Sequence, residues 1–344
     1  MKDAVILIPS YEPDDKLISL VDSLRDDDFP ILVVNDGSKE SFDPIFDKLK
    51  GKASYLSYKD NRGKGYALRY GYSHIEELYP NSKYVITVDG DGQHSIEDIN
   101  KIYNKLCETD KIVIGTRDFG KDIPPKSKFG NWYSKFNRSW LTKQYLSDDQ
   151  CGLRGFPVRY LKDLIKISGD RYEYEMHQIV KLEMMRVDIE TVPIKAIYEG
   201  GKNSTTHFAP IKDTLRIHSY IALHGIPSII CNLLLISMMI LAFHYSNLPT
   251  YAPIYISYLI STTLYLLLVN IVYRVRNIKR LFGEDLLAMA IHMLVAHLLL
   301  WLTIDILKWN YVAITPFVVV FASLINIPLA KFFHYIEKEP NKDI

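Results

Sequence analysis

Four apolar segments in the C-terminal part of the chain constrain its fold more than any other feature. Each has 19 to 22 residues and contains no Lys, Arg, Asp or Glu. An α-helix needs about 20 such residues to cross the hydrocarbon core of a bilayer. The sequence therefore predicts an all-α transmembrane domain of four helices. The segments lie near residues 226–245, 251–272, 286–304 and 311–330.

The basic residues between these segments predict their orientation. Arg274, Arg276, Lys279 and Arg280 crowd the link between the second and third segments. The link before them has no Lys or Arg, and the link after them has only Lys308. Loops rich in Lys and Arg favour the cytoplasmic side of a membrane. We therefore expect an integral membrane protein with both termini, and everything before the first span, in the cytoplasm.

The first 210 residues have the pattern of a separate α/β domain. Apolar, β-branched runs such as 4–9 and 31–34 alternate with amphipathic segments such as 14–25. This alternation predicts a mostly parallel sheet flanked by helices. We divide the chain into a cytosolic domain (1–210), a juxtamembrane segment (211–225), the four-helix transmembrane domain (226–335) and a cytoplasmic tail (336–344).

The composition excludes several classes of protein. The formal net charge is +1, whereas nucleic-acid binders normally carry a strong basic excess, so we expect no nucleic-acid partner. The three cysteines, Cys107, Cys151 and Cys231, lack the spacing of a metal site and fit reduced thiols. No glycine-rich phosphate loop of the P-loop or dinucleotide-binding type follows the first predicted strand.

The stretch 85–94 is an apolar strand that ends in two carboxylates, Asp89 and Asp91. In open α/β sheets the carboxyl ends of the strands face the crevice where ligands bind. Mg²⁺ typically takes one or two carboxylates together with substrate phosphates, so the pair predicts a metal–diphosphate site. The alternative is an acidic turn before a helix, in which Ser95 and Asp98 form a capping box.

Five short motifs lie along the first 154 residues. They are Pro9-Ser10-Tyr11-Glu12, Asn35-Asp36-Gly37-Ser38, Arg62-Gly63-Lys64-Gly65, Asp89-Gly90-Asp91-Gly92-Gln93 and Asp148-Asp149-Gln150-Cys151-Gly152-Leu153-Arg154. With these motifs in this order, the chain resembles family 2 glycosyltransferases of the GT-A fold over roughly residues 4–205. It is most similar to the polyprenyl-phosphate branch, which includes dolichyl-phosphate mannose synthases and bactoprenol glucosyltransferases. Ser10-Tyr11-Glu12-Pro13 departs from the more frequent Ala-Tyr-Asn of the family.

The resemblance implies a donor site for a nucleotide sugar. The nucleotide-binding residues that it implies are Pro9, Tyr11, Glu12, Asp36, Lys64 and Asp89. The residues that it implies around a Mg²⁺ or Mn²⁺ ion on the diphosphate are Asp89, Asp91 and Gln93. Two of these have simpler interpretations, because Asp36 fits an ordinary Asp-Gly turn and Lys64 fits a solvated lysine at the start of a helix.

The resemblance also implies that Asp148 and Arg154 lie beside the donor sugar and the acceptor. Together with Asp91 and Arg117 they are the predicted catalytic residues. Asp148 is a candidate base, or else it orients a sugar hydroxyl or a loop. A polyprenyl phosphate has a second pKa of about 6 by analogy with phosphorylated side chains, so its oxygen needs cations more than a base. The candidates are Arg117, Arg154 and Lys202, since a guanidinium can hold a phosphate with two bonds.

Three further segments have predicted roles around this site. Residues 127–146 carry aromatic side chains on one predicted helical face and basic ones on the other, which is typical of a helix in the membrane interface. The alternative is an amphipathic helix that packs on the sheet. Glu173 and Glu175 alternate, so one of them is expected to face the site. Residues 200–204 predict a mobile loop that closes over the donor.

The four apolar segments resemble the GtrA-like membrane domain in number and position. Polar residues inside a membrane are functional candidates by default, here for lipid-phosphate binding or for translocation of a sugar lipid. The alternative is that they only form hydrogen bonds between helices. They are Asn232, Asn270, His292, His297, Asp305 and Asn326.

These features together predict an inverting glycosyltransferase. It would move a hexose from a nucleotide sugar, UDP-glucose-like or GDP-mannose, to undecaprenyl or dolichyl phosphate at the cytoplasmic face of the membrane. Membrane lipids are further expected partners, and self-association would use the transmembrane domain. One alternative is a transferase that acts on a hydroxyl of a glycolipid or polysaccharide. Another is a membrane carrier or flippase whose N-terminal domain senses nucleotide sugars.

Overall fold

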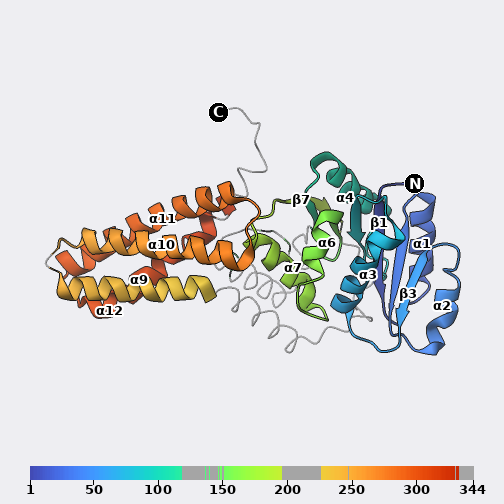
Figure 1. The fold of residues 1–344 in the computed structure, drawn as a ribbon, viewed down its shortest axis with the longest axis horizontal. Coiled ribbons are helices and arrows are strands. Elements are labelled where there is room, and N and C mark those ends of the chain that lie inside the picture. Colours follow the sequence, from blue (N-terminus) through green and yellow to red (C-terminus); the bar gives the residue numbers. More distant parts are fainter. Residues whose placement is uncertain are drawn as a thin grey trace. The chain divides into compact units, whose positions relative to one another are not determined.

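The computed structural model of this 344-residue chain describes the protein in two compact units. The described residues are 1–117, 136, 139, 146, 148, 151–195, 226–246, 248–329 and 331–332. The first unit contains those up to 117, with 148, 151–179 and 188–195. The second contains 136, 139, 146, 180–187 and the described residues from 226 on. Figure 1 draws the ribbon, coloured along the sequence.

Seven strands in the described part of the first unit form one sheet, in the order β3-β2-β1-β4-β6-β5-β7. Neighbours run parallel except at β6, which is antiparallel to both β4 and β5. The prediction of a mostly parallel sheet is therefore confirmed. The strands are β1 (Ala4–Ser10), β2 (Ile31–Asp36), β3 (Ser54–Tyr58), β4 (Tyr84–Thr87), β5 (Ile112–Arg117), β6 (Arg154–Pro157) and β7 (Ile189–Ile194).

The helices that begin at Lys16, Lys64 and Ile96 pack on the sheet through an apolar face. In α1 (Lys16–Asp26) that face consists of Leu17, Leu20, Val21 and Leu24, which are buried at helical spacing. They join a core with β-branched residues of β1, β2 and β4. The other described helices are α2 (Asp43–Asp47), α3 (Lys64–Leu78), α4 (Ile96–Thr109), α6 (Leu161–Leu164) and α7 (Glu173–Met184), with the short turns η1 (Glu40–Phe42) and η2 (Val158–Tyr160).

The order of the strands positions the candidate site. β1 pairs with β2 on one side and with β4 on the other, with Ile6 opposite both Ile31 and Ile86. The chain moves outward from β1 to β2 and β3, and then returns to add β4 on the opposite side. Beyond the carboxyl ends of β1 and β4 lies the switch point where open α/β sheets bind ligands. The motifs that follow these two strands therefore meet at one edge.

A capping box begins α4 directly after the acidic stretch. The Ser95 hydroxyl accepts the backbone N–H of Asp98 at 3.1 Å and donates to its carboxylate at 2.9 Å. This satisfies a backbone donor that the first helical turn leaves unpaired. The alternative interpretation of the stretch is thus correct for Ser95 and Asp98. It does not involve Asp89 or Asp91, which stay available for another role.

In the described part of the second unit, four long helices pack as a bundle, each on two neighbours (Figure 1). All four are long and apolar enough to cross a membrane, which confirms the predicted helices. Large apolar side chains such as Leu233, Leu259 and Ile271 are exposed on their outer faces, as expected for contact with lipid. The helices are α9 (Ile226–Tyr245), α10 (Tyr251–Tyr273), α11 (Ile278–Leu300), which continues as the π-helix η3 (Trp301–Ile306), and α12 (Tyr311–Ser323).

Helix α11 begins eight residues before the predicted apolar segment, at Ile278 rather than near 286. The additional turns contain charged residues, and Arg280, Glu284 and Asp285 among them form ion pairs within the unit. Arg280 Nε lies 2.7 Å from Glu284 Oε1, and Asp285 Oδ2 lies 2.9 Å from a guanidinium nitrogen of Arg186. The side chains of Arg186 and Asp285 are both 0% exposed. Because the charges compensate one another, they do not end the helix.

Several predictions fall on residues outside the described part of the chain. These are the interfacial helix over most of 127–146, the juxtamembrane segment 211–225, the loop 200–204 with Lys202, and the tail 336–344.

Candidate active site

Asp89 lies just beyond β4 at the switch point, in contact with two basic side chains. Lys64 Nζ, from the start of α3, is 2.6 Å from Asp89 Oδ1. The same nitrogen is 3.0 Å from Glu175 Oε2, on α7. His94 Nε2 is 3.7 Å from Asp89 Oδ2. One lysine therefore joins two carboxylates from distant parts of the sequence.

The electrostatics of this cluster keep both partners charged. Burial by itself would raise the pKa of Asp89, but Lys64 and His94 outweigh it and hold that pKa below its ordinary value. Burial would likewise lower the pKa of Lys64, but Asp89 and Glu175 raise it. Asp89 is thus an anion that already has a cationic partner at neutral pH.

Asp91 has no such partner among the described residues. Its carboxylate accepts one hydrogen bond, from the backbone N–H of Gln93 at 3.0 Å. Burial raises the pKa of Asp91, and the negative charge of Asp89 raises it further. A cation between the two carboxylates would reverse this effect. The backbone turns at Gly92, whose φ of +76° suits glycine.

The donor set of this turn fits a hard divalent cation. Asp89 and Asp91 have carboxylate oxygens, and the Gln93 amide could supply a neutral oxygen from the same turn. In the described part of the chain no group of three or more His, Cys, Asp and Glu side chains could hold a metal alone. Mg²⁺ usually keeps several waters and uses substrate phosphates as further ligands. The residues present therefore fit a Mg²⁺ or Mn²⁺ ion that binds together with a diphosphate.

Gly152 brings the last sequence motif against Asp89. The Thr87 hydroxyl of β4 donates to the Gly152 carbonyl at 2.8 Å. A Cβ atom at Gly152 would lie 2.5 Å from Asp89 Oδ2. Only glycine therefore allows this close approach between the segment before β6 and the acidic turn.

Arg117 and Asp148 form a bidentate ion pair near this segment. Arg117 donates from Nε at 2.8 Å and from a terminal nitrogen at 3.1 Å, and its backbone N–H donates at 3.1 Å. Asp148 is buried and Arg117 is partly exposed. Both are predicted catalytic residues, and the structure brings them together. The carboxylate holds the guanidinium in a fixed orientation.

Arg154 has a different environment. Its side chain is 1% exposed, and its nitrogens donate to the carbonyls of Cys151 (2.7 Å) and Glu175 (2.6 Å) and to the Gln178 amide (3.2 Å). These contacts tie the segment before β6 to α7. The predicted contact of Arg154 with an acceptor phosphate stays a prediction.

The first two motifs meet at the same edge of the sheet. The backbone N–H of Glu12, which follows β1, donates to the Ser38 hydroxyl at 2.8 Å. Glu12 has a φ of +47°, and its carboxylate lies 2.9 Å from Lys39 Nζ. Burial, and then Glu12, raise the pKa of the neighbouring Tyr11. Pro9 beside them is partly buried, and the predicted contact of these residues with a nucleoside stays a prediction.

Asp36 organises the loop that leads into α3. Its carboxylate accepts from the Tyr58 hydroxyl (2.8 Å) and from the backbone N–H groups of Arg62 (2.8 Å) and Gly63 (2.8 Å). The Asn61 amide donates to it at 3.0 Å. Burial nevertheless raises its pKa. Asp36 therefore fixes the loop beside Lys64, and its predicted contact with the nucleoside stays a prediction.

The sequence motifs alone indicate no role for His94 and Gly152, and the alternation of Glu173 and Glu175 does not show which of them faces the site. His94 follows Gln93 directly, so its position in the motif was the available signal. Glu175 contacts Lys64, whereas Glu173 accepts the N–H groups of Asp170 and Arg171 before α7. The choice depends on the rotation of α7, which the sequence alone does not contain.

Comparison with known proteins gives a consistent family match. The model of Glycosyl transferase family 2 matches residues 5–164, which include β1 to β6. The chain is 29% identical over 216 residues to a UDP-N-acetylglucosamine–dolichyl-phosphate N-acetylglucosaminyltransferase of Methanococcus voltae, covering 56% of this chain and 85% of the relative. It is 30% identical over 182 residues to an uncharacterized protein of Methanocaldococcus jannaschii, covering 50% and 78%.

A more distant relative comes from a eukaryote. The chain is 23% identical over 222 residues to the dolichyl-phosphate beta-glucosyltransferase of Saccharomyces cerevisiae. The match covers 55% of this chain and 65% of the yeast protein.

Proposed function

Since this chain belongs to glycosyltransferase family 2, we propose that it moves a hexose from a nucleoside diphosphate sugar to a polyprenyl phosphate. Two relatives support this acceptor, because both are transferases that act on dolichyl phosphate. Four helices that can cross a membrane follow the catalytic unit in the same chain. Such helices would hold the enzyme at the surface from which a lipid acceptor is drawn.

The observation that carries the proposal is the arrangement of Asp89 and Asp91. Two carboxylates lie at the switch point of the sheet, and the described residues supply a cation to only one of them. This asymmetry suits a site that is completed by a divalent cation and the diphosphate of the donor. When bound, the cation would neutralise the charge that develops on the departing nucleoside diphosphate.

Lys64 would assist the same step from the protein. Its ammonium group lies between Asp89 and Glu175 and donates to both. Lys64 is therefore held at the edge that the diphosphate would occupy. We propose that it donates to a phosphate oxygen of the donor while Glu175 keeps it in place. Pro9, Tyr11 and Glu12 would then line the nucleoside.

The acceptor phosphate would act as the nucleophile without a protein base. Its second pKa is about 6, so an anionic oxygen is present at neutral pH and attacks the anomeric carbon with inversion. Arg117 would bind this phosphate, and the bidentate contact with Asp148 would orient its guanidinium. Lys202 is a second proposed cation. Arg154 would act at the acceptor only if its segment moves, since its side chain is buried.

The orientation in the membrane follows from the basic residues between α10 and α11. Arg274 and Arg276 lie there, Lys279 and Arg280 follow in the first turn of α11, and we propose that this end of the two helices faces the cytoplasm. Both termini and the transferase unit would then be cytoplasmic. Nucleotide sugars and the catalytic unit would share one compartment.

A donor screen tests the proposal. Purified full-length protein in detergent receives radiolabelled UDP-glucose, UDP-N-acetylglucosamine, UDP-galactose or GDP-mannose, with dolichyl or undecaprenyl phosphate. Each reaction is run with Mg²⁺, Mn²⁺ or EDTA. Metal-dependent label in a lipid that is stable to alkali and labile to mild acid supports the proposal and names the sugar. No label in either polyprenyl phosphate from any donor, despite binding of a nucleotide sugar, contradicts it.

A further inference from the structure

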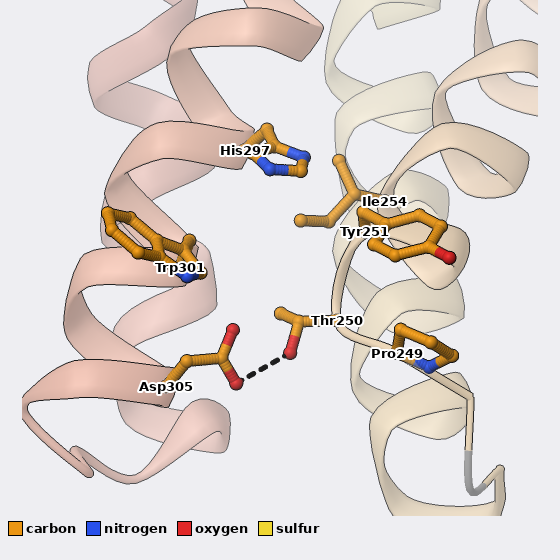
Figure 2. A pocket seen from close by; sticks show the side chains of 7 residues that line it. All are labelled: Pro249, Thr250, Tyr251, Ile254, His297, Trp301 and Asp305. Atoms are coloured by element: carbon orange, nitrogen blue, oxygen red, sulfur yellow. Dashed lines mark hydrogen bonds between the residues drawn. The ribbon is translucent and has the colours of Figure 1, made fainter.

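A pocket of about 230 Å³ lies within the second unit, between the start of α10 and the junction of α11 with η3. Figure 2 shows Tyr251 and Thr250 on one side of it and His297, Trp301 and Asp305 on the other. Pro249 and Ile254 complete its wall. None of these residues has a role in the transfer reaction proposed above.

The polar groups of the pocket are few and converge on one space. Asp305 Oδ1 accepts the Thr250 hydroxyl at 2.8 Å, as Figure 2 shows. His297 Nδ1 is buried, and no described residue forms a hydrogen bond with it. Ionisable groups in a transmembrane bundle are functional candidates because they are expensive to keep there. The sequence left open whether His297 only joins helices, and the structure gives it no such hydrogen bond.

Aromatic rings supply the rest of the surface. The His297 ring stacks on Tyr255, with centroids 5.5 Å apart, and on Tyr251 at 6.5 Å. Trp301 is 49% exposed and begins the π-helix η3. Short π-helical stretches within α-helices occur frequently at functional sites. The widened turn carries Trp301 and Asp305, so the irregularity and the pocket coincide.

The lining selects a class of ligand. It contains no Lys or Arg, so an anionic phosphate would meet the Asp305 carboxylate without a compensating cation. A carboxylate, a hydroxyl and an imidazole can instead form hydrogen bonds with a ligand that carries several hydroxyl groups. The negative faces of aromatic rings attract the C–H groups of such a ligand. The volume is below the roughly 300–1,000 Å³ of pockets for drug-sized ligands. A single neutral sugar ring meets all three conditions.

We infer that this pocket binds the hexose ring of a glycosylated lipid. The pocket lies at the end of the bundle where α10 begins and α11 ends, which is the end opposite the basic link between those helices. In the orientation proposed above this is the non-cytoplasmic end. The inference rests on the proposed function for the source of the sugar. It gives the product a binding site on the far side of the membrane from its synthesis.

Tryptophan fluorescence can test this pocket directly. The chain has four tryptophans, and replacing Trp132, Trp140 and Trp309 by Phe leaves Trp301 as the reporter. The full-length protein in nanodiscs is titrated with citronellyl phosphoryl-glucose, methyl β-glucoside and citronellyl phosphate, and with the corresponding N-acetylglucosamine and mannose compounds. Saturable quenching by a hexose-containing probe, with none by citronellyl phosphate, is the expected result.

Two variants and a control make the test specific. Asp305→Asn and His297→Phe preserve shape and are expected to weaken binding at least about tenfold, because each removes a hydrogen-bonding group from the lining. His244→Phe is the control, because His244 lies at the same end, contacts the Tyr311 hydroxyl at 2.8 Å and does not line the pocket. Unchanged transferase activity in all three verifies the fold.

The outcomes separate the pocket from the transfer reaction. If methyl hexosides bind as tightly as the lipid-linked probes, and Asp305→Asn weakens both, a sugar site is supported but its lipid source is contradicted. Binding that neither variant weakens, or equal binding of citronellyl phosphate, overturns the inference. Because methyl hexosides need no transferase activity, failure of the donor screen would not alter this test.

Discussion

Lys64 Nζ lies 2.6 Å from Asp89 Oδ1, whereas Asp91, two residues further along, has no cationic partner among the described residues. Of the two carboxylates in the motif, Asp89 therefore forms an ion pair with a lysine, and, within the described part of the chain, Asp91 accepts only a backbone hydrogen bond. Asp89 is stabilised by the protein itself. Asp91 is the acid whose negative charge would be compensated by a divalent cation that binds together with the donor diphosphate.

Replacing Asp91 tests this division. We expect Asp91→Asn to lower the rate of sugar transfer at least about 100-fold, because metal-ion stabilisation of transition-state charge contributes several kcal/mol. Thermal stability should not fall, since the charge of Asp89 raises the pKa of Asp91 and opposes its ionisation. The measurements are initial rates against Mg²⁺ or Mn²⁺ concentration and a melting curve. Wild-type rates in the variant would remove Asp91 from the metal site.

Replacing Lys64 should affect stability as well as activity. In Lys64→Met the carboxylates of Asp89 and Glu175 lose a largely buried partner, and breaking such a pair costs about 3–5 kcal/mol. Lys50→Met is the matched control, because its pair with Asp47 is exposed and should contribute nothing measurable. Urea unfolding at pH 7 distinguishes the two. Equal midpoints for both variants would contradict a stabilising role for Lys64.

The same ion pair predicts how stability depends on pH. The pKa of Asp89 is lower in the folded protein than its ordinary value of 3.8. A depressed carboxyl pKa contributes stability that is fully present above the ordinary value and is lost as the pH falls through the folded-state value. Wild-type stability should therefore fall below about pH 3.8, and Lys64→Met should lack this contribution. Parallel acid-unfolding curves for the two proteins would contradict the assignment.

Asp148 can be tested as a positioning residue rather than a base. We expect Asp148→Asn to raise KM for the acceptor lipid, because Arg117 loses its charged bidentate partner. The pH profile should keep its shape, with activity falling below about pH 6 as the acceptor phosphate is protonated. Arg117→Lys should raise the same KM, since a lysine cannot form the bidentate contact. Loss of the pH dependence in Asp148→Asn would instead identify a base.

Gly152 is predicted to tolerate no side chain. In Gly152→Ala the methyl group would lie 2.5 Å from Asp89 Oδ2, so either the Asp89 carboxylate or the segment before β6 must move. Such overpacking typically costs about 1–3 kcal/mol, and the shift should also lower activity. Gly283→Ala in α11 is the control, because nothing lies within 4 Å of its Cβ position. If both variants behave like the wild type, the close approach is not required.

The buried pair of Arg186 and Asp285 supports the second unit. Arg186→Met should destabilise it by about 3–5 kcal/mol, because Asp285 would be left as a buried unpaired charge. The double variant Arg186→Met with Asp285→Leu should recover much of this loss, since well-packed apolar pairs often replace buried ion pairs. Thermal unfolding in detergent measures both. A double variant less stable than the single one would show that the pair is irreplaceable.

Local signals were sufficient for much of the fold. The apolar runs of β1, β2 and β4 are buried, and α1 buries the four residues that its spacing predicts. The four long helices follow from hydropathy alone, because a bilayer requires length and apolar composition and little else. The meeting of Asp89, Asp91 and Glu12 at one edge follows from parallel strands with polar carboxyl ends.

The remaining features depend on contacts between distant residues. Strand β6 is four residues long and contains Arg154, Gly155 and Pro157, a composition that does not predict a strand. It forms because β4 and β5 each offer an unpaired edge. The burial of Arg154 likewise requires carbonyls from α7, and the early start of α11 requires Arg186 from another part of the chain. A local sequence pattern does not show which distant residues will contact a segment.

The antiparallel strand also has a consequence for synthesis of the protein. β4 and β5 are not neighbours, and β6 fills the space between them only after 36 further residues have followed Arg117. Until Arg154 leaves the ribosome, the edge of β4 beside the acidic turn is open, and such an edge can pair with another chain. A nascent chain that stalls before β6 would therefore expose the unpaired, aggregation-prone edge of β4 next to an incomplete catalytic centre. Chaperone binding should peak in that interval.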